Sequence, residues 1–117
     1  MLPPANRLKK EKEIKRARAG KMIGGSGLLA CRAAANDLPV ARFCFIVSKK
    51  ISPKAVVRNK VKRRLRAAIA AAMPRIASGF DCVLIARFGL AAKNYQEICD
   101  CVNLVLARTG LIKSNDK

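Results

Sequence analysis

The chain has 117 residues, 51% of them hydrophobic, and its formal net charge at pH 7 is +18. The hydrophobic content argues against disorder and the length predicts one domain over residues 1–117, whereas the charge predicts a polyanionic partner, either a nucleic acid or an anionic membrane surface. No apolar run approaches the ~18 residues that span a bilayer, and no apolar segment with a cleavage site follows the basic N-terminus, so we expect a cytoplasmic protein without a membrane partner.

The N-terminal region is predicted to hold a short basic helix. Residues 1–5 contain two prolines and are expected to be loose, as are residues 113–117. The helix is expected over Lys9–Ala19 and is closed by Gly20 in the left-handed conformation.

Strand signals follow in three segments. Residues 24–27 are glycine-rich and predict a turn, with room for a very short strand before it. Leu28–Ala34 is a weak strand, and Asn36–Pro39 has the composition of a turn. Ala41–Ser48 has apolar residues on both sides, which predicts a central strand covered on both faces. Phe80–Phe88 predicts a second buried strand.

The most distinctive segment is residues 49–66, with nine Lys or Arg and no acid. A helix is expected from Ala55 until Pro74 ends it near Met73. Its apolar stripe is expected to comprise Val57, Val61, Leu65, Ala68 and Ala72. The opposite face is expected to carry Asn59, Lys62, Arg63 and Arg66. Arginine suits phosphate oxygens, so we interpret this as a phosphate-binding helix, although a merely solvated basic face is the alternative.

The last helix has clear signals at both ends. Asn94 and Glu97 resemble an N-cap arrangement, and Gly110 closes the helix. Its expected apolar stripe comprises Tyr95, Ile98, Val102 and Val105. The order of elements predicts an α+β fold, a single-domain α/β sandwich with three helices on a mixed sheet of three to four strands.

The sequence offers no constellation for catalysis by the protein itself. It contains no histidine, and its seven acids are scattered without the grouping of a two-metal nuclease site. The five cysteines lack C-x-x-C spacing, so we expect no metal site and read them as free, buried thiols in a reducing compartment. Any phosphodiester cleavage would need an active site from another molecule.

A family resemblance rests on four stretches. These are VSKK at 47–50 followed by KAVVRNKVKRRLR at 54–66, with NRLKK at 6–10 and FDCVLIAR at 80–87. Together they resemble the bacterial ribonuclease P protein subunit. The resemblance implies a left-handed βαβ crossover, as in the second domain of ribosomal protein S5. It also implies RNA-binding roles for Lys49, Lys50, Lys54, Arg58, Asn59, Lys62, Arg63 and Arg66.

The resemblance further implies a division of labour. The protein would bind ribonuclease P RNA and the 5′ leader of precursor tRNA to assist endonucleolytic 5′ maturation of tRNA. The RNA subunit would be the catalyst and would bind the Mg²⁺, and no obligate protein partner is expected. The residues implied for a leader cleft are Ile14, Arg18, Leu29, Cys31 and Phe43.

The chain departs from the family at that cleft. Ile14, Arg18 and Cys31 match positions where the family has aromatic side chains. Aromatic stacking contributes about 1–3 kcal/mol per base, and of these three residues only Arg18 can stack, through its guanidinium plane. Leader binding would then depend more on charge, and simple core packing is the alternative for Ile14 and Cys31.

Other functions compete with this interpretation. A structural RNA-binding protein of the ribosomal type would share the charge and a similar fold, and the RNA that co-purifies would separate the two. A protein-only nuclease is disfavoured by the missing histidine. A DNA-binding helix-turn-helix is disfavoured because nothing before the basic helix reads as the first helix of such a motif.

Overall fold

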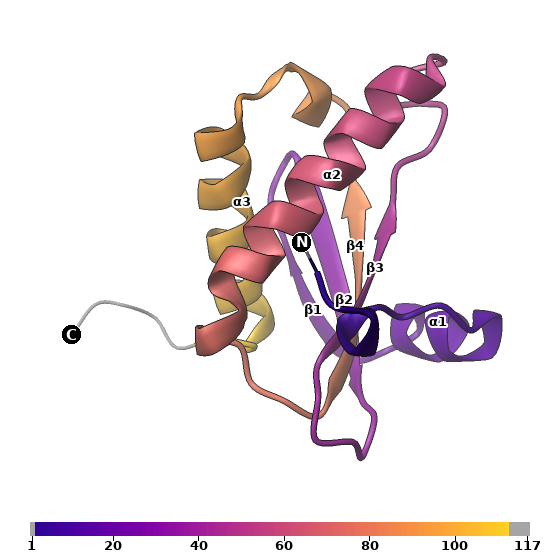
Figure 1. Cartoon of the computed structure of the whole chain (residues 1–117), viewed down its shortest axis with the longest axis vertical. Coiled ribbons are helices and arrows are strands. Elements are labelled where there is room, and N and C mark those ends of the chain that lie inside the picture. The colour runs from indigo at the N-terminus through magenta and orange to yellow at the C-terminus, as the bar shows by residue number, and fades with distance from the viewer. Residues whose placement is uncertain (1, 113–117) are drawn as a thin grey trace.

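The computed structural model describes residues 2–112, and it has three helices packed on one four-stranded mixed sheet (Figure 1). The strands are β1 (Met22–Gly25), β2 (Leu29–Ala35), β3 (Arg42–Ile46) and β4 (Phe80–Ala86). The helices are α1 (Glu11–Arg18), α2 (Ala55–Ala72) and α3 (Tyr95–Thr109), with short 3-10 turns η1 (Pro4–Asn6), η2 (Met73–Arg75) and η3 (Leu90–Ala92). The predicted α+β class is confirmed. The expectation for residues 113–117 lies outside the described residues.

The sheet order is β1-β2-β4-β3, with β3 parallel to β4 and the other pairs antiparallel. The prediction of a central position for 41–48 was therefore wrong, because β3 lies at an edge. The N-terminal segment covers part of that edge, where the backbone N–H of Leu8 donates to the carbonyl of Phe43 at 2.8 Å. In Figure 1, α2 crosses in front of the sheet from β3 to β4 on its left, with both strands pointing upward, so the crossover is left-handed as the resemblance implied.

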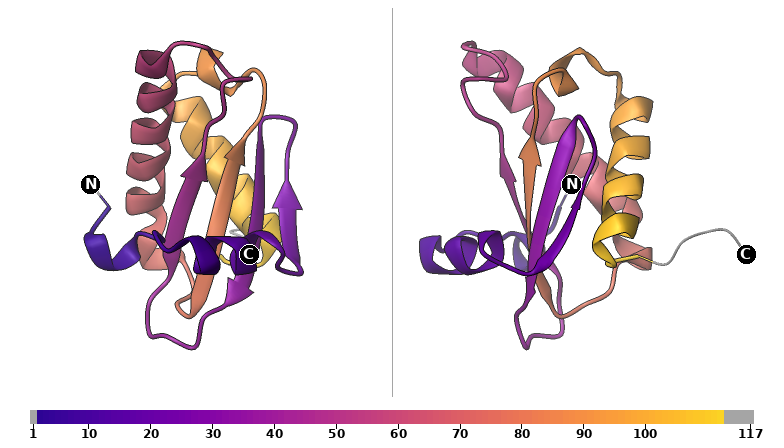
Figure 2. Two further views of the ribbon diagram at one scale, coloured as in Figure 1. Left: turned by 90° about the vertical axis from the view of Figure 1, so that its right-hand side faces the viewer. Right: turned by 180° about the vertical axis from the view of Figure 1, so that it is seen from behind.

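The two faces of the sheet are covered unequally. Helices α2 and α3 pack on one face, and α1 crosses only the lower part of the other (Figure 2). The main core lies on the α2–α3 side, where Phe43, Leu65 and Leu84 are almost completely buried. On the α1 side a small cluster forms around Leu8, Ala17 and Val83. The upper part of that second face is therefore left without a covering helix.

The helices follow their sequence patterns with three differences. In α2 the predicted stripe is buried except for the half-buried Val57, and Ile69 joins it. In α3 the predicted N-cap is a capping box between Asn94 and Glu97, and Gly110 is left-handed with φ 88°. Tyr95 at its start is 42% exposed and does not belong to the buried stripe.

The N-terminal residues correct one expectation. Residues 2–5 were expected to be loose, yet Leu2 is fully buried in the main core, and the Arg7 side chain donates to its carbonyl at 2.9 Å. Asn6 also donates to the carbonyl of Ala41 at 2.9 Å. The segment is held because one large apolar side chain is buried and its backbone carbonyl is satisfied by a neighbouring guanidinium.

Two glycines serve close approach rather than turns. Gly20 was predicted to be left-handed, but a Cβ there would lie 2.1 Å from the carbonyl oxygen of Ala33, so Gly20 lets the end of α1 approach β2. Gly24 lies inside β1 rather than in a turn, and a Cβ there would lie 2.2 Å from the hydroxyl oxygen of Thr109. Helix α3 can pack on β1 because this position has no side chain.

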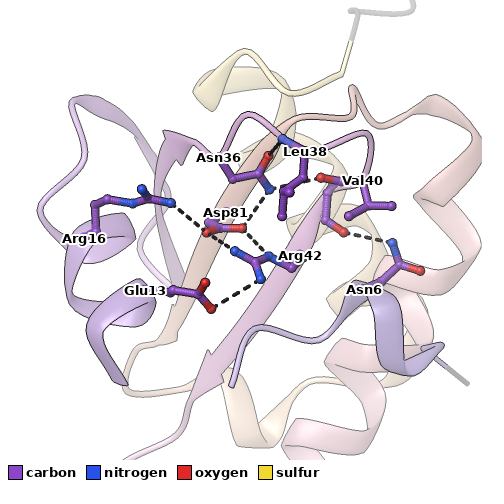
Figure 3. Close-up of polar contacts among 9 residues, drawn as sticks. Asn6, Glu13, Arg16, Asn36, Leu38, Val40, Arg42 and Asp81 are labelled. Atoms are coloured by element: carbon purple, nitrogen blue, oxygen red, sulfur yellow. Dashed lines mark hydrogen bonds and ion pairs between the residues drawn. The ribbon is translucent and has the colours of Figure 1, made fainter. Parts of the chain in front are cut away.

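A buried carboxylate fixes α1 to the sheet (Figure 3). Asp81 of β4 is fully buried and accepts two hydrogen bonds from Arg42, both at 2.8 Å, and one from Asn36 at 2.8 Å. From α1, Arg16 reaches the same carboxylate at 3.4 Å, while Glu13 pairs with Arg42 at 3.3 Å. Burial alone would raise the pKa of Asp81, but the hydrogen bonds from Arg42 and Asn36 and the charge of Arg42 outweigh it, so the pKa lies below its ordinary value of 3.8.

This network gives a prediction for stability. Asp81→Asn should lower the free energy of unfolding at pH 7 by about 3 kcal/mol, because it leaves the guanidinium of Arg42 without its buried counter-charge. The folded pKa of Asp81 is depressed, so its stabilisation is complete above the ordinary pKa of 3.8 and is lost as the pH falls through the folded value. Denaturant unfolding between pH 2.5 and 7 measures both effects. Asp100→Asn is the control, since that exposed acid contacts only Gln96 among the hydrogen bonds of the described residues. Equal loss in both variants would contradict the prediction.

Candidate RNA-binding surface

Helix α2 presents a row of positive charges that has no acidic partner among residues 2–112. Asn59 and Arg63 are exposed, and Lys62 and Arg66 are half-buried at the side nearest β3. The ion pairs found among residues 2–112 involve only Arg16 and Arg42 as cations. The charges of α2 therefore repel one another without internal compensation, and a polyanion would relieve that repulsion.

A pocket of about 240 Å³ lies where α2 meets the edge of the sheet. Its lining comes from the N-terminal segment, β3 and α2, and comprises Arg7, Leu8, Lys9, Phe43, Cys44, Phe45, Lys62 and Arg66. Four of these eight side chains are cations, which is the composition expected of a site for phosphate oxygens.

The end of α1 approaches the same region. Burial raises the pKa of the Cys44 thiol, and the positive charges of Lys62 and Arg18 oppose that rise. Both cations therefore act on one side chain of β3, Lys62 from α2 and Arg18 from α1. Cys44 lines the pocket and also packs in the cluster on the α1 side, so the pocket adjoins the α1 side of the sheet.

The structure divides the eight predicted RNA-binding residues into four groups. Lys62 and Arg66 line the pocket, whereas Asn59 and Arg63 point away from it into solvent. Lys49, Lys50 and Lys54 are exposed in the link between β3 and α2. Arg58 has a second task, because its guanidinium donates to the carbonyl of Ser52 at 2.9 Å and so holds the same link against the helix.

The five residues predicted for a leader cleft do not meet in one place. Ile14 and Arg18 lie on α1, but Leu29, Cys31 and Phe43 point to the other face of the sheet, into the main core. Cys31 is fully buried, and burial raises its pKa to about 11, so it is a packing residue. The assignment of Leu29 and Cys31 to a cleft was therefore wrong, although Phe43 also borders the pocket.

The physical reason is the alternation of side chains along β2. A shift of one residue moves a side chain to the other face. The neighbour of Cys31, Arg32, is exposed on the α1 side, and its guanidinium donates to the carbonyl of Arg18 at 3.4 Å. The alternation of Leu29, Cys31 and Ala33 with Arg32 was visible in the sequence and could have indicated this.

We use the name open sheet face for the α1-side surface that α1 leaves partly uncovered. It comprises Ala30, Arg32, Cys44, Ile46 and Ile85, of which Arg32 is exposed and the others are half-buried. It is bordered by Ile14 and Arg18 from α1 and by Lys62 from α2. The surface is shallow and apolar with a cationic border, which suits an unpaired nucleic acid strand more than a small molecule.

The described part of the chain holds no group of three or more His, Cys, Asp or Glu side chains that could ligate a metal ion. None of its helices is both long enough and apolar enough to cross a membrane. The charge of this surface is suited to binding anions.

Comparison with known proteins identifies relatives of the whole chain. A family model described as ribonuclease P matches residues 2–110. The ribonuclease P protein component of Roseiflexus castenholzii is 36% identical, with 93% of this chain and 89% of the relative covered. That of Microcystis aeruginosa is 35% identical, with 95% and 96% covered. The structure of the Staphylococcus aureus RNase P protein has the same fold, with a TM-score of 0.82 at 24% identity and 92% and 98% of the chains covered.

The two sides of α2 should differ in their contribution to RNA binding. Replacing Arg63 or Arg66 with Ala should weaken binding of the cognate RNA by about 1–3 kcal/mol, as for the loss of a charge-assisted hydrogen bond. Replacing the exposed Lys60 should cost less than about 1 kcal/mol, as for a surface charge that contributes only to the overall field. Filter binding at one fixed salt concentration measures the difference.

Arg64 is unsuitable as the matched control, because its guanidinium donates to the carbonyl of Lys93 at 3.0 Å and ties α2 to the segment after η3. Thermal melts of the three variants should match the wild type, since none of the side chains belongs to the buried stripe. Equal losses at Lys60, Arg63 and Arg66 would mean that only net charge matters.

Proposed function

The chain belongs to the ribonuclease P protein family, whose known role is 5′ maturation of tRNA, and from that premise we propose how its surfaces divide the work. As the protein component of an endoribonuclease ribonucleoprotein, it has ribonuclease P RNA as its partner. We assign α2, together with the pocket that Lys62 and Arg66 line, to that RNA, and the open sheet face to the 5′ leader of precursor tRNA. The observation that carries the proposal is the cationic row of α2 beside a cationic pocket, where residues 2–112 supply α2 with no ion-pair partner and hold no cluster of metal-ligating side chains.

The chemistry of the two sides of α2 differs. Arg63 and Asn59 point outward, where a guanidinium fork and an amide can bind phosphate oxygens or exposed base edges. On the other side, Lys62 and Arg66 line the pocket together with Arg7 and Lys9 of the N-terminal segment, a set of cations that suits a phosphodiester. A backbone neutralised on both sides in this way is held in register, whatever its sequence.

Leader binding here would use arginine in place of aromatic residues. Arg18 and Arg32 lie next to each other at the border of the open sheet face, and a guanidinium plane can stack on a base. The half-buried apolar side chains of Ile46 and Ile85 provide the floor. We therefore expect leader binding to be more sensitive to salt than stacking between aromatic rings and bases would be.

The proposed Mg²⁺ sites belong mainly to the RNA. Several acids of this chain are engaged within the fold, for example Asp81 and Glu13 with Arg42 and Glu97 in the cap of α3. We propose that Mg²⁺ is bound mainly by the RNA, and that the protein lowers the concentration required because its cations neutralise crowded phosphates. The five cysteines are free thiols, typical of a reducing compartment, and we infer a cytoplasmic site of action.

Catalytic activity should depend on the RNA. The isolated protein, treated with nuclease to remove bound RNA, should not cleave precursor tRNA. Addition of cognate ribonuclease P RNA should restore cleavage, with a lower Mg²⁺ requirement than the RNA alone, because protein cations replace part of the metal's charge. Gel-based cleavage over a Mg²⁺ series measures this. Mg²⁺-dependent cleavage by the RNA-free protein would contradict the proposal, and co-purification with ribosomal RNA alone would favour the ribosomal-type alternative.

Binding should fall steeply with salt. Each neutralised phosphate releases counterions, so six or more contacts predict roughly a thousandfold loss of affinity between about 50 and 200 mM salt. Titration of the protein with ribonuclease P RNA at four salt concentrations gives the slope. A double substitution of Arg63 and Arg66 should reduce that slope by about two contacts. A nearly flat salt dependence would show that the cations of α2 are only solvated.

A further inference from the structure

A tight turn after β4 presents one aromatic side chain to solvent. Phe88 is 84% exposed. The turn is closed by the N–H of Leu90 donating to the carbonyl of Arg87 at 3.2 Å, and Gly89 takes the left-handed conformation with φ 101°. Both ends are anchored, because the N–H of Arg87 donates to Leu28 at 2.9 Å and the Leu90 side chain is fully buried. The backbone therefore holds Phe88 outward at little further cost in conformational entropy.

Phe88 stands apart from the other aromatic residues. The chain has only four phenylalanines and one tyrosine. Phe43, Phe45 and Phe80 pack in the main core. Tyr95 is 42% exposed at the start of α3, the helix that covers the opposite face of the sheet. A base can stack only on an accessible ring, and among the described residues Phe88 offers the most accessible one.

Cations surround this turn. Arg87 extends over the open sheet face, since its Nη2 atom would lie 3.8 Å from a Cβ placed on Gly25, two strands away. Because β3 and β4 are parallel neighbours, Lys49 and Lys50 leave the sheet at the same end as Phe88. An exposed ring among cations is the composition of a surface for unpaired nucleotides, whereas an apolar protein partner would find no larger apolar patch here.

The position of the turn relates it to the open sheet face. Asp81, at the first end of β4, contacts α1, and Phe88 lies seven residues further along. At about 3.3 Å per residue in a strand, the two points are roughly 20 Å apart, a span of several nucleotides. A strand of RNA that starts at Arg18 and Arg32 and follows the open sheet face therefore reaches Arg87, and the exposed ring of Phe88 lies on the next residue, in the turn at that end of the sheet.

We propose that Phe88 stacks on one unpaired base of the 5′ leader, while Arg87 binds an adjacent phosphate. This rests on the proposed function and adds a second contact point, at the end of the sheet remote from α1. Ile14 and Arg18 on α1 are not aromatic. The ring of Phe88 would supply the aromatic stacking that these two residues lack.

The test uses the holoenzyme reconstituted with ribonuclease P RNA and precursor tRNAs that carry a single abasic nucleotide at successive leader positions. In the wild type, one leader position should be sensitive to base removal, with a loss of affinity of about tenfold, as for one base stack. Phe88→Ala should show the same loss with the intact leader and no further loss with that abasic substrate. Phe88→Trp should retain the sensitivity and Phe88→Leu should not, and Tyr95→Ala is the matched control that should leave affinity unchanged.

Three results would overturn the inference. If Phe88→Ala leaves the abasic profile unchanged, no leader base stacks there. If Phe88→Ala weakens binding of ribonuclease P RNA while leader sensitivity is retained, the ring contacts the other RNA. If the wild-type holoenzyme binds leaderless and leader-bearing precursors equally, the leader contact in the proposed function fails as well. If the holoenzyme still binds leader-bearing precursors more tightly than leaderless ones, but substitution of Phe88 has no effect, only the present inference is refuted.

Discussion

The buried carboxylate of Asp81 determines how the α1 side of this protein is assembled. Helix α1 has a thin apolar side, with Ala17 buried and Ile14 only half-buried, so hydrophobic contact holds it weakly. At one end of the sheet, Asp81 pairs with Arg16 of α1, and Arg42, which also pairs with Asp81, pairs with Glu13 of α1. These ion pairs add directional contacts. Because these contacts set where α1 crosses the sheet, they also set how much of the open sheet face stays uncovered. The geometry of the proposed leader surface thus depends on a charge that no RNA touches.

The scarcity of acids has a second consequence. With 25 cations and 7 acids in the chain, each acid used inside the fold leaves more positive charge without compensation outside it. Glu97 caps α3, and Asp81 and Glu13 are committed to Arg42. The fold therefore uses carboxylates to position its own elements and leaves α2 unneutralised. Partner affinity and self-repulsion have the same origin, so stability and RNA binding are physically linked.

Local patterns predicted the elements well and their spatial relations poorly. The apolar stripe of α2 and the capping box of α3 depend on residues within one or two turns, and both were readable from the sequence. The edge position of β3 depends on which strands pair, and no local pattern encodes that. The cleft assignment failed for a related reason, because Cys31 and Arg32 are adjacent in sequence but lie on opposite sides of the sheet. Asp81 was not recognised, since an acid in an apolar strand gives no sign of its distant partners Arg42 and Arg16.

The pairing of the N-terminal segment with β3 also protects the edge of the sheet against pairing with another chain. An uncovered edge strand rich in apolar residues is a template for pairing with another chain, and hence for aggregation. Here the backbone of Arg7 and Leu8 lies along Phe43 and covers part of that edge. The same short segment contributes Arg7 and Lys9 to the cationic pocket. Evolution cannot freely redesign this segment for RNA affinity, because any change that loosens it exposes an edge through which copies of the protein could join.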